Sequence, residues 1–162
     1  MTDPLRRRST YDRALDLLEA RSRGIVELRR LLLRKGEPEA DVDAAIERLR
    51  ASGLLDDANF ARQLTRSKAL GAGLSRRRIA QELAKRGVDR GVSSEAIADV
   101  FDEEGVDEDA TIERVARKKL RLMSKLDAVT RERRLFAFLA RRGYQADDIQ
   151  RVLRSLLTET EQ

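Results

Sequence analysis

The sequence predicts an all-α protein: an elongated, curved array of three tandem three-helix repeats, with about nine helices. Ala, Leu, Arg and Glu, all strong helix formers, dominate the 162 residues. Apolar residues recur at helical spacing, with almost none of the alternation that is typical of strands. One pattern also occurs three times, as ELRRLLLRKG, RIAQELAKRG and RLFAFLARRG, each ending in two basic residues and a glycine. Such internal similarity indicates a repeat array.

Apolar spacing and capping residues place the expected helices in three groups of three. Residues 1–10 are expected to form a flexible basic tail, followed by repeats over 11–55, 56–105 and 106–162. The expected helices lie at about 11–21, 25–35 and 39–51, from an Asp56 or Asp57 cap to Gly71 or Gly73, from a Ser75 cap to Gly87, from a Ser93 or Ser94 cap, from the acidic run 107–109, from a Thr130 cap to Gly143, and at about 146–157.

The three copies align on their closing glycines, Gly36, Gly87 and Gly143. The residues eight and four positions before each glycine are apolar in every copy, which predicts a core of small repeats that support one another through their interfaces. The second copy needs four extra residues around Asp89 to Val92 to keep this register. The basic pair before each glycine has a structural explanation, because cations in the last turn oppose the negative end of the helix dipole.

Composition excludes many kinds of site. The chain has no Cys and no His, so disulfides, thiolate or histidine zinc sites and the Ser-His-Asp triad are impossible. No phosphate-binding P-loop motif is present, and the acidic run 102–109 lacks the ligand spacing of an EF-hand. The first ten residues lack the apolar core of a secretory signal, and no apolar run could span a bilayer. We therefore expect a cytoplasmic monomer with no catalysis, cofactor, metal or membrane contact.

Charge is distributed in blocks along the chain. Nine basic and two acidic residues lie between 62 and 90, nine acidic and no basic residues between 91 and 113, and eleven basic and two acidic residues between 114 and 142. Blocks of this kind suggest separate charged faces. A solvated surface is the simpler explanation for any one run, and the excess of 28 Arg over 6 Lys is also what a GC-rich genome produces.

Three basic clusters are the candidate partner- or DNA-binding residues. They are Arg76, Arg77 and Arg78; Arg117, Lys118, Lys119 and Arg121; and Arg131, Arg133 and Arg134. The first and third are expected at the start of the repeated helix, where the dipole disfavours cations, so no structural role explains them. They could contact phosphates or an acidic protein face. Few aromatic residues are available to stack bases, which argues against an independent single-strand platform.

Residues 53–88 resemble the most recognisable segment of the RecX family, the bacterial regulators of the RecA recombinase. The matching features are Leu54, Leu55, Asp56, Asp57, Phe60 and the closing Lys85-Arg86-Gly87. Leu64 departs from the pattern, since family members often carry a second aromatic near this position. The similarity extends over about 11–157 and implies tandem three-helix repeats. It also implies binding in the groove of the RecA filament and inhibition of its extension, ATPase, strand exchange and co-protease activity.

Three hypotheses about function follow. The first is a non-catalytic regulator that binds the RecA–DNA filament, using several weak contacts along an elongated body. The second is a helical-repeat module that binds single- or double-stranded DNA directly through its basic clusters, with steep salt dependence. The third is a helical scaffold for some other protein.

Overall fold

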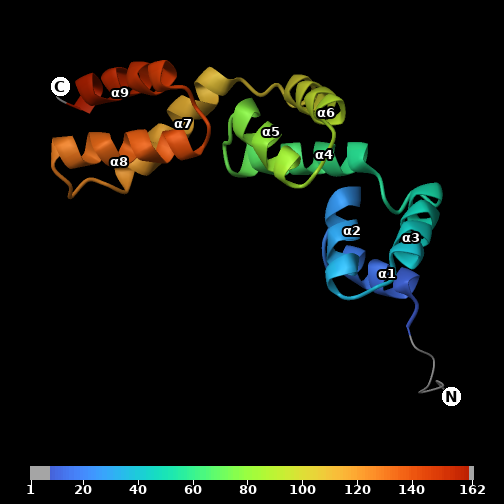
Figure 1. The fold of residues 1–162 in the computed structure, drawn as a ribbon. Coiled ribbons are helices and arrows are strands. Elements are labelled where there is room, and N and C mark those ends of the chain that lie inside the picture. The colour runs from blue at the N-terminus through green and yellow to red at the C-terminus, as the bar shows by residue number, and fades with distance from the viewer. Residues whose placement is uncertain (1–7, 161–162) are drawn as a thin grey trace.

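The computed structural model describes residues 8–160, and over this range the chain forms nine α-helices, one π-helical turn and no strand. The helices fall into three groups placed one after another, so the body is elongated and bent, with α1 and α9 at opposite ends (Figure 1). The predicted all-α array of three three-helix repeats is confirmed.

The first repeat packs three helices around a small aliphatic core. Its helices are α1 (Thr10–Ala20), α2 (Ile25–Arg34) and α3 (Glu39–Ala51). The core is formed mainly by Ala14, Leu28, Leu32, Val42, Ile46 and Leu49. Leu28 and Leu32, eight and four positions before Gly36, are fully buried as the alignment predicts.

The second repeat has the same plan, with a π-helical turn added after its first helix. Its elements are α4 (Asp57–Arg66), η1 (Ser67–Gly71), α5 (Arg76–Lys85) and α6 (Arg90–Glu103). Ile79 and Leu83 of α5 are fully buried and pack in one cluster with Phe60, Ile97 and Phe101. The two phenylalanines give this repeat a larger core than the aliphatic first repeat.

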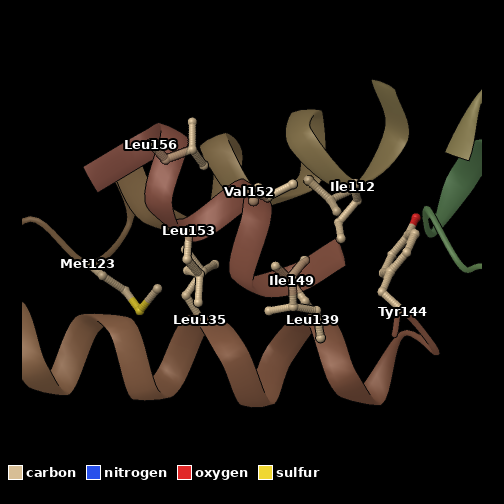
Figure 2. Close-up of a cluster of buried hydrophobic side chains, with 11 residues drawn as sticks. Ile112, Met123, Leu135, Leu139, Tyr144, Ile149, Val152, Leu153 and Leu156 are labelled. Carbon is tan, nitrogen blue, oxygen red and sulfur yellow. The ribbon is translucent and has the colours of Figure 1, made fainter. Parts of the chain in front are cut away.

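The third repeat consists of three longer helices. They are α7 (Glu108–Arg121), α8 (Ala128–Arg141) and α9 (Ala146–Thr160). Leu135 and Leu139 of α8 point towards Ile149 and Leu153 of α9 across the core, and Met123 lies at one end of the row (Figure 2).

Two helices begin about one turn earlier than the sequence analysis predicts. The α6 helix is capped by Asp89, and Ser93 is buried inside the helix, so a cap at Ser93 or Ser94 is wrong. The α8 helix is capped by Asp127, whose side chain accepts a hydrogen bond from the Thr130 amide at 2.9 Å. In both cases an aspartate that lies earlier in the chain than the predicted cap accepts the free amides of the helix N-terminus. Aspartate caps a helix at least as well as serine or threonine. The four extra residues of the second copy thus form the start of α6.

The junction of repeats 1 and 2 brings the start of α2 against the end of α5. The Ile25 amide, free at the helix N-terminus, donates to Asp57 Oδ1 at 2.9 Å. Gly87 lies directly against Val26, since a Cβ on this glycine would come within 2.6 Å of the Val26 Cβ. A side chain of the next repeat therefore caps a helix of the previous one, and a glycine allows the close approach.

The junction of repeats 2 and 3 repeats this arrangement with other residues. The Arg76 amide at the start of α5 donates to Glu108 Oε1 at 2.8 Å. The Ser75 amide donates to the Arg142 carbonyl at 3.0 Å, which joins the two backbones directly. A Cβ on Gly143 would come within 2.5 Å of the Cβ of Arg78. The closing glycine is again the point of contact with the preceding repeat.

Tyr144 adds a buried hydrogen bond to this second junction. Its hydroxyl donates to the Gly73 carbonyl at 2.7 Å, and the side chain points from repeat 3 towards the green segment of repeat 2 (Figure 2). Burial, with a smaller contribution from the negative charge of Glu108, raises the pKa of Tyr144 to about 12.

The two junctions together place the second helices one after another along the array. The start of α2 lies against the end of α5, and the start of α5 lies against the end of α8.

Candidate functional site

The acidic block of the second repeat neutralises arginines of α4. Arg62 lies 3.1 Å from Asp99 and 2.6 Å from Glu103, and Arg66 lies 2.6 Å from Glu104. The hydrogen bond from Arg62 lowers the pKa of the Glu103 carboxyl below its usual value. The basic block 62–90 and the acidic block 91–113 therefore meet where α4 packs against α6. Arginines without a carboxylate partner must be sought on other surfaces.

The first candidate cluster divides into structural and free residues. Arg76 places its guanidinium 4.2 Å from the centre of the Phe101 ring, beside the glutamate that accepts its amide hydrogen bond. Arg78 packs at the second junction, with its Nε 3.6 Å from Glu82. Arg77 is exposed and forms no ion pair with any side chain described between residues 8 and 158. The expectation that no structural role explains this cluster is therefore wrong for Arg76 and Arg78.

The second cluster lies on the last two turns of α7. Arg117 pairs with a glutamate one turn earlier at 2.7 Å. Lys119 places its ammonium 5.1 Å from the centre of the Phe138 ring on α8, an attractive cation–π geometry. Lys118 and Arg121 are exposed. This cluster is in the last turns of its helix, where the dipole favours cations.

The third cluster is not at a helix start. Because α8 begins at Ala128, Arg131, Arg133 and Arg134 lie in its second turn, so the dipole argument does not apply to them. Arg133 lines a largely apolar groove of about 780 Å³ between α8 and α9. Arg134 lies on the opposite flank of α8 and faces α7. The structure therefore separates residues that are adjacent in the sequence.

The second and third clusters meet in one pocket between α7 and α8, here called the α7/α8 pocket. It has a volume of about 490 Å³, and its basic lining residues are Lys119, Lys125, Arg134 and Arg141. No carboxylate lines it, and none of the four cations forms an ion pair within the described part of the chain. Four like charges that face one pocket without counter-charge attract an anionic ligand.

A second basic groove, the α2/α5 groove, crosses the first junction. It has a volume of about 520 Å³ and is lined by Arg30, Arg34, Lys85 and Arg86, with Glu27 as its one carboxylate. Glu27 is already paired, since it contacts two arginines that precede α2. Members of the basic pairs before the closing glycines thus line these two cavities: Arg34, Lys85 and Arg86 line the α2/α5 groove, and Arg141 lines the α7/α8 pocket. Their repetition in all three copies was the signal that could have identified them.

Two other kinds of site receive no support from residues 8–160. No group of three or more Asp and Glu side chains is placed to hold a metal ion. Helices long and apolar enough to cross a membrane are also absent from this range. The accessible chemistry of the described chain is its charged surface.

Three helical repeats joined by one recurring junction, with basic grooves along their second helices, define a helical-repeat protein that presents charged surfaces. Three consecutive family models match the chain: the first three-helix domain of RecX at 11–49, the second at 56–100 and the third at 107–153. The chain belongs to the RecX family.

Individual relatives agree with this assignment. The chain is 39% identical to regulatory protein RecX of Mycobacterium ulcerans over 144 aligned residues. The alignment covers 88% of this chain and 82% of that protein. It is 39% identical over 134 residues to regulatory protein RecX of Mycobacterium tuberculosis, covering 80% and 75%.

Solved structures share the fold. The crystal structure of RecX from Lactobacillus salivarius is 20% identical with a TM-score of 0.68, covering 91% of this chain and 94% of that one. A crystal structure of regulatory protein RecX is 22% identical with a TM-score of 0.71, covering 88% and 70%. At these identities the likeness concerns the repeat architecture alone.

Proposed function

We propose that this protein regulates RecA by binding the RecA–DNA filament in the cytoplasm, without a reaction of its own. The observation that carries the proposal is the match of all three RecX domains in order, with 39% identity over 88% of the chain. As a monomer lodged in the helical groove of the filament, it would limit filament extension. ATPase, strand exchange and co-protease activity would fall as a consequence.

The physical form of the molecule suits this role. A filament repeats the same surface at regular intervals, and an elongated array of three repeats can contact more than one subunit at a time. Linked weak contacts give a much higher affinity than each would give alone. Catalysis is not required, because a body that spans adjacent subunits can obstruct the next addition.

The free members of the basic clusters are the proposed contacts. They are Arg77, Lys118, Arg121, Arg133 and Arg134, which are all exposed. Arg76, Arg78 and Arg131 are assigned a smaller part, since the first two also support the second junction and the third is half-buried. A contact test should therefore change Arg77 and leave its two neighbours intact.

The experiment is a titration of the protein into a RecA ATPase assay with single-stranded DNA, at low and moderate salt. Inhibition is expected at substoichiometric to equimolar amounts. Arg77→Glu should weaken inhibition without changing the thermal unfolding temperature. Unchanged RecA activity over the whole titration at both salt concentrations would contradict the proposal.

A second candidate function, direct DNA binding, is favoured by one observation. The α7/α8 pocket holds four cations and no carboxylate, as a site for phosphates requires. The two functions are compatible, because the filament itself contains DNA.

A further inference from the structure

The second helices α2, α5 and α8 present equivalent faces, here called the second-helix face. It consists of the residues nine, six and two positions before each closing glycine. These residues lie on one flank of the helix, because steps of three and four residues return to the same side. They are Glu27, Arg30 and Arg34; Arg78, Gln81 and Lys85; and Arg134, Ala137 and Arg141. Six of these nine positions are basic.

The two basic cavities lie on this same face. The positions nine, six and two before the glycine line the α2/α5 groove in repeat 1 and the α7/α8 pocket in repeat 3. The same three positions of the second helix therefore line a cavity in repeat 1 and in repeat 3. The second-helix face is therefore one basic surface that recurs along the array.

The face continues across both junctions. At the first junction Arg34 of α2 and Lys85 of α5 line one groove. At the second junction Arg78 of α5 lies against Gly143, directly after the basic pair that ends α8. Each second helix starts where the next one ends, so cations follow one another from repeat 1 to repeat 3.

The distribution of charge favours a linear polyanion. Arg134 and Arg141 are seven residues apart on α8, or about 10.5 Å at 1.5 Å per residue. One strand of B-form DNA carries a phosphate about every 3.4 Å along its axis, so this length spans about three phosphates. The apolar floor of the pocket, formed by Leu122, Met123 and Leu126, can contact sugars. A carboxylate patch on a folded protein has no such regular spacing.

We propose that the second-helix face binds the phosphate backbone of DNA, with the α7/α8 pocket as its strongest point. The proposal deepens the second candidate function and, for the filament, rests on the proposed RecA role. It places DNA contacts on Lys125, Arg134 and Arg141, of which only Arg134 belongs to a candidate cluster. Arg77 and Arg133 lie on other flanks, in a cleft beside α7 and in the α8/α9 groove.

The test compares two variants with the same change of net charge. The face variant carries Lys125→Glu, Arg134→Glu and Arg141→Glu. The control variant carries Arg90→Glu, Arg114→Glu and Arg154→Glu, three exposed arginines that belong to no candidate cluster and line neither basic cavity. Binding of fluorescent single-stranded and duplex DNA is measured without RecA, from low to moderate salt.

The face variant should lose at least ~30-fold in affinity at low salt. The slope of log affinity against log salt concentration should become less negative by about two for single-stranded DNA and by about three for duplex DNA, because three phosphate contacts are lost. The control variant should stay within about threefold of the unchanged protein. Equal losses in both variants, or no loss in the face variant, would overturn the proposal.

Two further arms keep the result interpretable. Poly-glutamate is titrated into each variant, and a face that binds it as tightly as DNA would indicate an acidic protein partner and overturn the proposal. If charge reversal lowers the thermal unfolding temperature, the Gln substitutions at the same three positions replace the Glu substitutions, with at least ~10-fold loss expected. RecA inhibition is assayed separately, so failure of the RecA role leaves the DNA result intact, and the reverse also holds.

Discussion

The two junctions between repeats use the same positions of the repeat but different chemistry. At the first junction the carboxylate of Asp57 caps α2, and Gly87 faces the Cβ and methyl groups of Val26. At the second junction a glutamate caps α5, two backbones are joined by a hydrogen bond, and the buried Tyr144 hydroxyl adds another. The second junction is therefore the more polar and the less able to adjust.

The corresponding surface of repeat 1 meets no other repeat within residues 8–160, and its chemistry differs from that of the two junctions. A Cβ on Gly36 would meet nothing within 4 Å, although its φ of +84° matches the +76° of Gly87 and the +92° of Gly143. The position after Gly36 is Glu37, which is buried, accepts a hydrogen bond from the Thr10 hydroxyl and pairs with Arg13. The glycine thus has two separable roles: a left-handed helix end in all three copies, and close packing in two.

The largest effect is expected from Gly143→Ala. At every closing glycine, adding a side chain at positive φ costs about 1–2 kcal/mol. At Gly143 the new Cβ would also approach the Arg78 backbone nitrogen at 3.0 Å, which cannot rotate away. Overpacking adds about 1–3 kcal/mol. We expect a loss of roughly 2–5 kcal/mol in the free energy of unfolding, measured by denaturant titration with circular dichroism.

Gly36→Ala is the matched control for this change, because it shares the positive φ and lacks the contact. Gly36→Ala should lower the free energy of unfolding by only about 1 kcal/mol. The strain of a side chain at positive φ is partly offset, because alanine reduces the conformational entropy of the unfolded chain. Equal losses at positions 36 and 143 would show that the second junction is not as tightly packed as described.

An intermediate effect is expected from Gly87→Ala. The new Cβ would meet the Cβ and both methyl groups of Val26, and only the methyl groups can move by rotation of the side chain, so part of the clash can be relieved. We expect a loss of about 2–3 kcal/mol by the same measurement, from the strain and a partial overpacking cost. The double variant Gly87→Ala with Val26→Ala should recover part of this stability relative to the single variant, since it removes the two contacting methyl groups and keeps the Val26 Cβ. A lack of recovery would locate the cost in the backbone strain and the contact between the two Cβ atoms.

Apart from the Gly36→Ala control, the smallest effect is expected from Tyr144→Phe. Losing the hydroxyl leaves the Gly73 carbonyl without its side-chain partner, which costs about 1–2 kcal/mol. The pH dependence identifies the cause. An unfolded tyrosine loses its proton near pH 10, whereas Tyr144 keeps its proton up to about pH 12. Its contribution is thus fully present below pH 10 and declines between pH 10 and 12, because the unfolded state then binds fewer protons.

Unfolding of the unchanged protein and of Tyr144→Phe should therefore be compared from pH 8 to 12. The stability gap between the two should narrow above pH 10. A constant gap across this range would contradict the burial of the hydroxyl at the junction.

Much of the architecture could be predicted because it depends on local pattern. Spacing of leucines at Leu28 and Leu32, and at the matching positions of the other copies, correctly gave the core, and the glycines gave the helix ends. The starts of α6 and α8 were missed because several capping residues occur within one turn of each other. Local sequence does not say which of Asp89, Ser93 or Ser94 accepts the amides.

The candidate surface was predicted less well, for a reason of geometry. Neighbours in sequence such as Arg133 and Arg134 face opposite flanks of α8, whereas Lys119 and Arg134 meet across two helices. Runs of like charge therefore indicated basic character correctly without indicating which side chains share a surface. Arg76 could not be recognised as a junction residue, because its partners Phe101 and Glu108 come from later elements.

The sequence by itself determined the helices, their grouping into three repeats and the family, because these follow from periodicity, caps and similarity that are local to the chain. Tertiary structure alone decided which charges remain uncompensated and why the closing glycines are required. Arg62 and Arg66 are neutralised by a helix some forty residues away, whereas the cations of the α7/α8 pocket meet no carboxylate. Both outcomes depend on distances between repeats and helices, which arise only when the chain packs.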